Sequence, residues 1–147
     1  MRAWINLFEK AWHGSPNAAR IDALRPSLGG ELGPGLYFSR DYRTAAGYAI
    51  PSGEDAVSAY SGVLELDLDA LNIKTIARQE WLDRRAQLMD QFQAANGGDW
   101  KGEFYNLAMA QMIDEYEAEG FDGLYDDWNQ GIVFPDRVDR VRIVRGT

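Results

Sequence analysis

Four residues of the sequence have the types and spacing to hold a flat cationic ring attached to a sugar. The sole histidine, His13, is followed directly by Gly14, and a glycine lets a ligand approach the backbone closely because it has no Cβ. A histidine can donate a hydrogen bond to a sugar hydroxyl, and a glycine amide and carbonyl can pair with a flat carboxamide. Tyr37 and Tyr48 stand eleven residues apart. Their rings could sandwich such a cation, with about 0.5–2 kcal/mol from each face.

Each of these residues also has an ordinary structural explanation. A histidine at the end of a strand can be satisfied by a neighbouring carbonyl, and two tyrosines can belong to an aromatic-rich core. Residues 29–35 contain four glycines and one proline, which could suggest a phosphate cradle. This segment lacks the Gly-Lys-Ser/Thr ending of a P-loop, so we expect a mobile loop over a cleft.

Hydrophobic periodicity and turn residues predict the elements that position these side chains. The predicted strands cover residues 8–13, 36–38, 63–68, 131–134 and 138–144. The predicted helices cover residues 18–24, 40–49, 79–95 and 103–119, and Ser39 is a candidate N-cap for the second of them. Strands near the ends with helices between them predict an α+β fold, and we expect one domain over residues 1–147.

Length, composition and charge exclude several classes of protein. The chain has 147 residues, of which 46% are hydrophobic, so we expect a folded domain. It has no cysteine and one histidine, which excludes disulfides and thiolate or multi-histidine metal sites, and we expect no metal. The net charge of −8 disfavours generic nucleic-acid binding. No apolar run reaches the ~20 residues of a membrane span and no signal peptide is evident, so we expect a cytoplasmic protein without a membrane partner.

Three early segments, taken together, are far more specific than any of them alone. They are Trp12-His-Gly-Ser15, Gly35-Leu-Tyr-Phe-Ser39 and Ala45-Ala-Gly-Tyr-Ala49. In this order and spacing they resemble the ADP-ribosyltransferase superfamily. The similarity is to its His-Tyr-Glu branch, which diphtheria-type toxins, poly(ADP-ribose) polymerases and many small phage and bacterial effectors share.

Two late segments, 122–125 and 130–136, and the residues 138–141 that follow them, look like the third motif of the small phage and bacterial members. The resemblance covers residues 12–49 and 120–144, whereas residues 50–119 match nothing that we can name. A toxin-like effector is the biological role that these relatives suggest.

The resemblance implies an ADP-ribosyltransferase-like fold, in which two small sheets split around a cleft for NAD⁺. It assigns His13 to a hydrogen bond with a ribose hydroxyl and the backbone of Gly14 to the nicotinamide carboxamide. Tyr37 and Tyr48 would flank the nicotinamide ring, and Ser39 is included among the NAD⁺-binding residues. NAD⁺ would be a substrate, with no metal required.

The sequence departs from the family at the position of the catalytic glutamate, where it has Gln130. A glutamine can orient a ribose hydroxyl but brings no negative charge, a loss that commonly costs 10²–10³ in rate. Asp126, Asp127 and Glu119 are close in sequence, although we expect them in a solvated loop. Arginine-modifying relatives carry Glu or Gln two residues before the catalytic position. That residue is Trp128 here, so we expect no arginine acceptor.

The sequence therefore predicts a mono-ADP-ribosyltransferase that acts on a macromolecule, with protein as the expected acceptor. His13, Tyr37 and Gln130 are the predicted catalytic residues. Two alternatives stay open, an NAD⁺ glycohydrolase that uses water and a binding module that has lost turnover. Transfer to nucleic acid is a further alternative, which the net charge disfavours.

Overall fold

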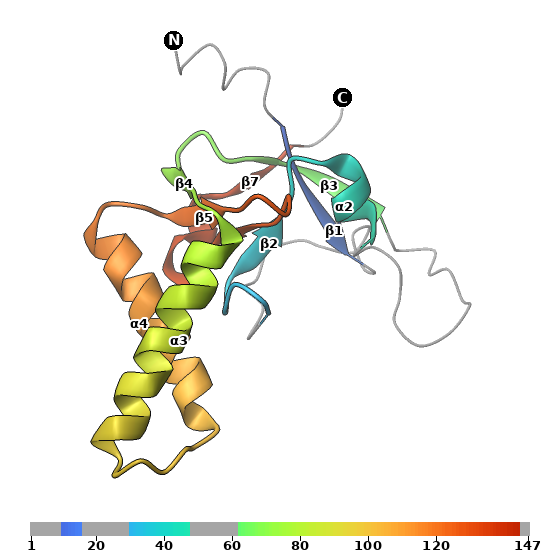
Figure 1. Ribbon diagram of the computed structural model, residues 1–147. Helices are drawn as coiled ribbons and strands as arrows, with labels where there is room; N and C mark the ends of the chain where they lie inside the picture. The colour runs from blue at the N-terminus through green and yellow to red at the C-terminus, as the bar shows by residue number, and fades with distance from the viewer. Residues whose placement is uncertain (1–9, 16–29, 48–61, 145–147) are drawn as a thin grey trace.

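The protein has an α+β fold built from two β-sheets and a pair of long helices (Figure 1). The computed structural model describes residues 10–15, 30–47 and 62–144. The strands are β1 (Ala11–Ser15), β2 (Leu36–Phe38), β3 (Gly62–Asp67), β4 (Ile73–Thr75), β5 (Gly123–Tyr125), β6 (Gly131–Val133) and β7 (Arg142–Ile143). The helices are α2 (Tyr42–Gly47), α3 (Arg78–Ala95), α4 (Glu103–Ala118) and the 3-10 helix η2 (Pro135–Arg140).

The first sheet has the order β1-β3-β7, and its neighbouring strands are antiparallel. Leu66 of the central strand β3 lies opposite Ala11 on one side and Ile143 on the other. Leu64 and Leu66 pack into the core, while Glu65 and Asp67 alternate with them. This is the pattern of a strand with one covered face, and it confirms the strand predicted at 63–68.

The second sheet has the order β2-β6-β5-β4. The strands β2, β6 and β5 are antiparallel neighbours, whereas β4 and β5 are parallel. Parallel strands need a long crossover connection, and here the connection consists of α3 and α4. The two helices form a hairpin that projects away from both sheets (Figure 1).

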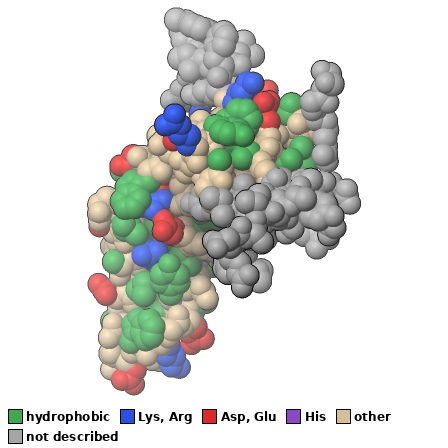
Figure 2. Space-filling model, turned by 90° about the vertical axis from the view of Figure 1, so that its right-hand side faces the viewer, with side chains coloured by type: hydrophobic (Ala, Val, Ile, Leu, Met, Phe, Trp, Pro, Cys, Tyr) green, Lys and Arg blue, Asp and Glu red, His purple; other side chains and the backbone are tan. Residues whose placement is uncertain are grey.

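The hairpin is held together by apolar side chains at helical spacing. In α3, Trp81 and Leu88 are almost completely buried, and in α4 Ala108, Met109 and Met112 face them. The opposite sides of the helices are exposed, and Figure 2 shows hydrophobic, acidic and basic side chains interspersed over the hairpin.

Both faces of the second sheet are covered, because β2 and β6 send alternate side chains into two cores. Tyr37 and Ile132 lie opposite each other and pack with the helical hairpin. Leu36, Phe38 and Val133 pack into the core shared with the first sheet. Every residue of β6 is therefore buried.

Near the end of the chain, the structure differs from the elements that were predicted from sequence. The strand expected at 138–144 is wrong, because Pro135–Arg140 forms a 3-10 helix and only Arg142–Ile143 is a strand. Proline fixes the φ angle that the start of a helix needs. The alternation of Val and Arg residues in this segment had indicated a strand instead. In this helix Arg137 and Arg140 both contact Asp122, with N–O distances of 3.1 and 3.3 Å.

The other predicted elements differ in smaller ways. The long helices at 79–95 and 103–119 are confirmed, to within a residue at each end. The first strand extends to Ser15 and not to His13, and β4 and β5 were not predicted. The helix expected at 18–24 lies outside the described residues. Over the described part of the chain, none of the helices is both long and apolar enough to cross a membrane.

Candidate functional site

The two sheets are joined at one backbone pair, Trp12 with Ser39. The amide of Trp12 donates to the carbonyl of Ser39 at 2.7 Å, and the amide of Ser39 donates to the carbonyl of Trp12 at 2.8 Å. Within the described residues this is an isolated bridge, so no backbone ladder continues between β1 and β2 beyond it. We call this interruption the gap between β1 and β2. This junction between the two sheets lies next to His13.

Gly14 turns its backbone polar groups toward the gap between β1 and β2. In an antiparallel ladder, the N–H and C=O groups of residues two apart point to the same neighbouring strand. Trp12 directs its groups to Ser39, so Gly14 directs its own toward β2. Among the described residues, no backbone hydrogen bond joins Gly14 to β2. A donor and an acceptor therefore lie side by side along this edge of β1.

The side chain of His13 reaches from β1 to β2. Its Nδ1 atom is 2.6 Å from the carbonyl oxygen of Tyr37. A carbonyl only accepts hydrogen bonds, so Nδ1 carries the proton. Burial lowers the pKa of His13 from its ordinary value of 6.5, although the hydrogen bond to the Tyr37 carbonyl works in the opposite direction.

A neutral His13 with its proton on Nδ1 leaves Nε2 as a hydrogen-bond acceptor. A ribose hydroxyl would then donate to His13, the reverse of the donation expected from sequence. The strand-end carbonyl bond that sequence offered as the ordinary explanation is present as well. The two descriptions are compatible, because they concern different nitrogens of one ring.

Tyr37 fastens the glycine-rich loop that precedes it. Its hydroxyl accepts a hydrogen bond from the amide of Leu32 at 2.9 Å and donates one to the carbonyl of Gly33 at 2.5 Å. The ring lies against Gly30, where an added Cβ would come within 2.4 Å of the hydroxyl. The described part of this segment, residues 30–35, is thus tied to β2. Tyr48, the second ring of the predicted sandwich, lies outside the described residues.

Ser39 links the end of β2 to the turn between β5 and β6. Its buried hydroxyl donates to the carbonyl of Asn129 at 2.5 Å and accepts from the amide of Asp41 at 3.0 Å. The N-cap of α2 is Asp41 and not Ser39, because the Asp41 carboxylate accepts from the amide of Arg43 and the hydroxyl of Thr44. A contact between Ser39 and NAD⁺ stays a prediction.

Gln130 directly precedes β6 and is buried. The backbone carbonyl of Gln130 accepts a hydrogen bond from the backbone amide of Asp126 at 2.9 Å, and the backbone amide of Gln130 donates one to the Asp126 carboxylate at 3.0 Å. The same carboxylate oxygen accepts from the amide of Trp128. Asn129 completes this turn with a φ of 59°, a conformation that asparagine tolerates better than most residues.

One buried arginine, Arg78, is the first residue of α3 and holds this turn against the helix. It donates from Nε to the second Asp126 oxygen at 2.7 Å and from Nη2 to the Gln130 side-chain oxygen at 2.5 Å. Its Nη1 pairs with Glu31, and the guanidinium stacks 4.5 Å from the centroid of the Trp128 ring. Burial alone would lower the Arg78 pKa, but the hydrogen bonds and charges of Asp126 and Glu31 raise it.

This arginine was missed by the sequence reasoning, and Asp126 was misassigned. Asp126 was expected in a solvated loop, but it is only 2% exposed and is paired with Arg78. Asp127 is exposed as expected, and it accepts a hydrogen bond from the backbone amide of Arg78. Arg78 and Asp126 are 48 positions apart in sequence, and no local pattern connects them.

Five of the six predicted site residues can be placed, and they lie close together in the fold. His13 and Gly14 line one side of the gap, and Tyr37 and Ser39 belong to the facing strand or its end. Gln130 directly precedes β6 and Ser39 directly follows β2, so both are adjacent to the paired residues Phe38 and Gly131. These residues come from three separate segments that only the folded chain brings together.

Comparisons of the chain with protein-family models, with curated proteins and with solved structures found no match. Over the ranges that the structure describes, no cluster of three or more His, Asp or Glu side chains could hold a metal ion.

Proposed function

We propose that this protein binds NAD⁺ at the gap between β1 and β2 and transfers ADP-ribose to a macromolecular acceptor. The observation that carries the proposal is the isolated Trp12–Ser39 bridge, beyond which no backbone ladder joins the described residues of β1 and β2 beside His13 and Gly14. Its support is the coincidence of this gap with the residues whose order in the sequence resembles an ADP-ribosyltransferase. The proposed acceptor is a protein.

The backbone of Gly14 suits the carboxamide of nicotinamide. A carboxamide presents one acceptor oxygen and an NH₂ donor in one plane, and Gly14 directs one N–H and one C=O toward the gap. The absence of a Cβ lets the ring approach this edge. In this arrangement the His13 Nε2 atom accepts a hydrogen bond from a ribose hydroxyl.

Tyr37 and Tyr48 are proposed to enclose the nicotinamide ring. The Tyr37 ring cannot rotate away easily, because its hydroxyl is bonded to both Leu32 and Gly33. A ring held in place before the ligand arrives loses little conformational entropy on binding.

The reaction breaks the bond between the ribose carbon and the nicotinamide nitrogen. Its electron pair leaves with nicotinamide, which departs neutral, and positive charge develops on the ribose. The acceptor then bonds to the ribose carbon and releases its proton. Groups that stabilise this developing charge accelerate the reaction, and the neutral Gln130 amide is not one of them.

The test is incubation of the protein with labelled NAD⁺, alone and with a bacterial lysate. Label on lysate protein, with an equal amount of nicotinamide released, is the expected result. Free ADP-ribose in the absence of lysate would favour the glycohydrolase. Calorimetric binding of NAD⁺ with no nicotinamide after hours would favour the binding module, and no binding at all would refute the proposal.

The binding module has one structural observation in its favour. The side-chain oxygen of Gln130 accepts a hydrogen bond from Arg78, so the residue at the family's glutamate position already serves a buried network. Turnover would then need its negative charge from another residue.

A further inference from the structure

Three carboxylates contact Arg78, two at its guanidinium and one at its backbone amide, and the three differ in their exposure to solvent. The side chain of Asp126 is 0% exposed, and both its oxygens accept hydrogen bonds. Asp127 accepts from the backbone amide of Arg78 at the start of α3. The side chain of Glu31 is 69% exposed and pairs with Nη1. Within the described chain, this guanidinium is the one partner that Glu31 has.

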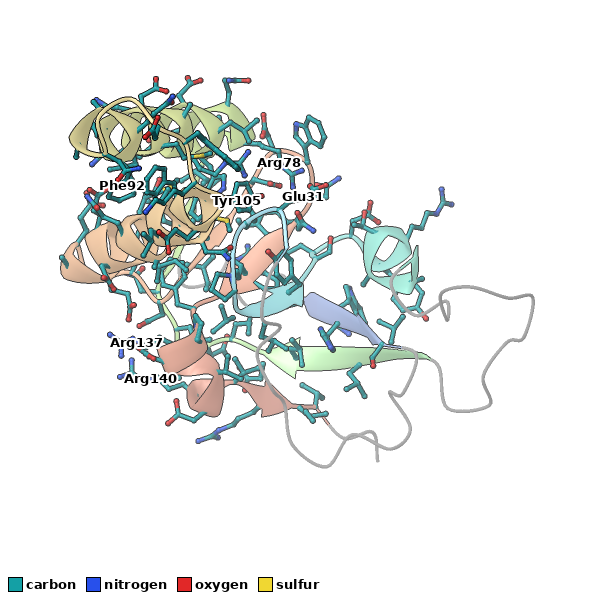
Figure 3. The ribbon with its side chains drawn as sticks, turned by 90° about the horizontal axis from the view of Figure 1, so that it is seen from below. Glu31, Arg78, Phe92, Tyr105, Arg137 and Arg140 are labelled. Carbon is teal, nitrogen blue, oxygen red and sulfur yellow. The ribbon has the colours of Figure 1, made fainter. Side chains whose placement is uncertain are left out.

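The Glu31 carboxylate lies next to the side chain of Gln130. The Nη1 and Nη2 nitrogens of Arg78 share one carbon, and they bond to Glu31 and to Gln130 respectively. The two acceptor groups are therefore neighbours on one planar fork. Figure 3 shows Glu31 and Arg78 side by side at the start of α3.

The position of Glu31 is fixed by Tyr37. The residues on either side of Glu31 are both in contact with the Tyr37 side chain: Gly30 lies against the ring, and the amide of Leu32 donates to the hydroxyl. Leu32 is itself fully buried. Glu31 is thus held between two of the predicted catalytic residues, Tyr37 and Gln130, although its carboxylate is open to solvent.

The single positive charge of Arg78 is shared by two carboxylates, the buried Asp126 and the exposed Glu31. Asp126 is buried against the guanidinium, while Gln130 is neutral. The cluster of Arg78, Asp126, Glu31 and Gln130 therefore carries one excess negative charge, and the exposed member is Glu31.

We propose that Glu31 is a catalytic residue that supplies the negative charge absent from Gln130, an inference that rests on the proposed function. As the bond to nicotinamide breaks and its electron pair leaves with the ring, the positive charge moves to the ribose. Glu31 faces that charge, and Gln130 orients a ribose hydroxyl beside it. Arg78 is a positioning residue that holds both side chains.

The test compares nicotinamide release and NAD⁺ binding in four proteins, namely wild type, Glu31→Gln, Glu80→Gln and the double variant Glu31→Gln/Gln130→Glu. Glu31→Gln should lower kcat about 10²–10³-fold, the usual loss for such an electrostatic group, with little change in the NAD⁺ dissociation constant. Glu80 is another exposed carboxylate, in the first turn of α3, so Glu80→Gln removes the same charge and should leave kcat unchanged.

The double variant returns a carboxylate to the same guanidinium and should recover at least about tenfold of the loss. Release by Glu31→Gln at the wild-type rate would overturn this inference and leave the proposed function intact. A wild type that binds NAD⁺ without releasing nicotinamide would also overturn it. A wild type that does not bind NAD⁺ would refute the proposed function itself.

Discussion

The replacement Asp126→Asn tests whether the buried ion pair with Arg78 holds the turn before β6. Asparagine has nearly the same shape as aspartate, so the change removes a charge without creating a cavity. The Asp126 carboxylate accepts from the amides of Trp128 and Gln130 at 2.9 and 3.0 Å and from Nε of Arg78 at 2.7 Å. The substitution therefore weakens three hydrogen bonds and leaves a buried guanidinium with an exposed partner, Glu31.

We expect Asp126→Asn to lower the free energy of unfolding by about 3–5 kcal/mol, which is the usual cost of removing one member of a buried ion pair. This is a large share of the ~5–15 kcal/mol that a natural domain has. Urea unfolding followed by circular dichroism measures it, because the midpoint should fall while the slope with denaturant stays constant.

Asp127→Asn is the matched control, because Asp127 is adjacent and exposed and accepts a single backbone hydrogen bond from Arg78. Asparagine keeps an oxygen that can accept this bond and is as favourable as aspartate at helix starts, so the change removes only a negative charge near the helix N-terminus and should cost about 0.3–1 kcal/mol. Adding Arg78→Met to Asp126→Asn should cost less than the sum of the two single changes, because the second removal no longer leaves a lone charge. If Asp126→Asn unfolds within ~1 kcal/mol of wild type, the pair does not hold this turn.

Three further predictions concern Tyr37, Gly131 and His13. Tyr37→Phe should lower the free energy of unfolding by about 1–3 kcal/mol through loss of the bonds to the 32–33 backbone. NAD⁺ binding should weaken only slightly, because the ring remains but is no longer held by its hydroxyl; calorimetry that shows a loss of affinity greater than about tenfold would contradict this. Gly131→Ala should cost about 1–3 kcal/mol, because its Cβ would lie 2.3 Å from the Phe38 ring. In contrast, a Cβ at Gly47 meets none of the described residues within 4 Å, so Gly47→Ala should be neutral or stabilising. Burial lowers the pKa of His13 in the folded protein, so below about pH 6.5 the unfolded chain binds more protons at this residue than the folded chain. The stability that the neutral, buried His13 contributes is complete above pH 6.5 and is lost as the pH falls through the folded pKa. An NMR titration of the ring that gives a pKa of 6.5 or higher would contradict the buried, neutral histidine.

Local patterns predicted the long elements well. The stripes of Trp81 and Leu88 in one helix and Met109 and Met112 in the other recur at helical spacing, and both helices are present. The short strands β4 and β5, of three residues each, were missed. The parallel pairing of β4 with β5 joins segments on either side of the helical hairpin, which no local pattern reveals.

The candidate site shows the same division between local and distant information. The placement of His13 and Tyr37 in strands followed from sequence, whereas the end of the first strand at His13 did not, because β1 continues through Gly14 to Ser15. The buried role of Asp126 and its pairing with Arg78 did not, because a buried ion pair resembles two surface charges when only the sequence is read. The proximity of Glu31 to Gln130 also depends on this arginine, which reaches both from a third segment.

Calorimetric titration of NAD⁺ into wild type, His13→Asn and His13→Gln tests the central claim most directly. Asparagine can keep a nitrogen donor for the Tyr37 carbonyl, where Nδ1 lies now, but it has no atom at the Nε2 position. Glutamine reaches the Nε2 position with an oxygen and lacks the Nδ1 donor. Wild type should bind NAD⁺, and His13→Asn should bind about 3- to 10-fold more weakly than His13→Gln, as expected for one hydrogen bond. Equal affinities in all three proteins, or no binding by wild type, would contradict a site for NAD⁺ between β1 and β2.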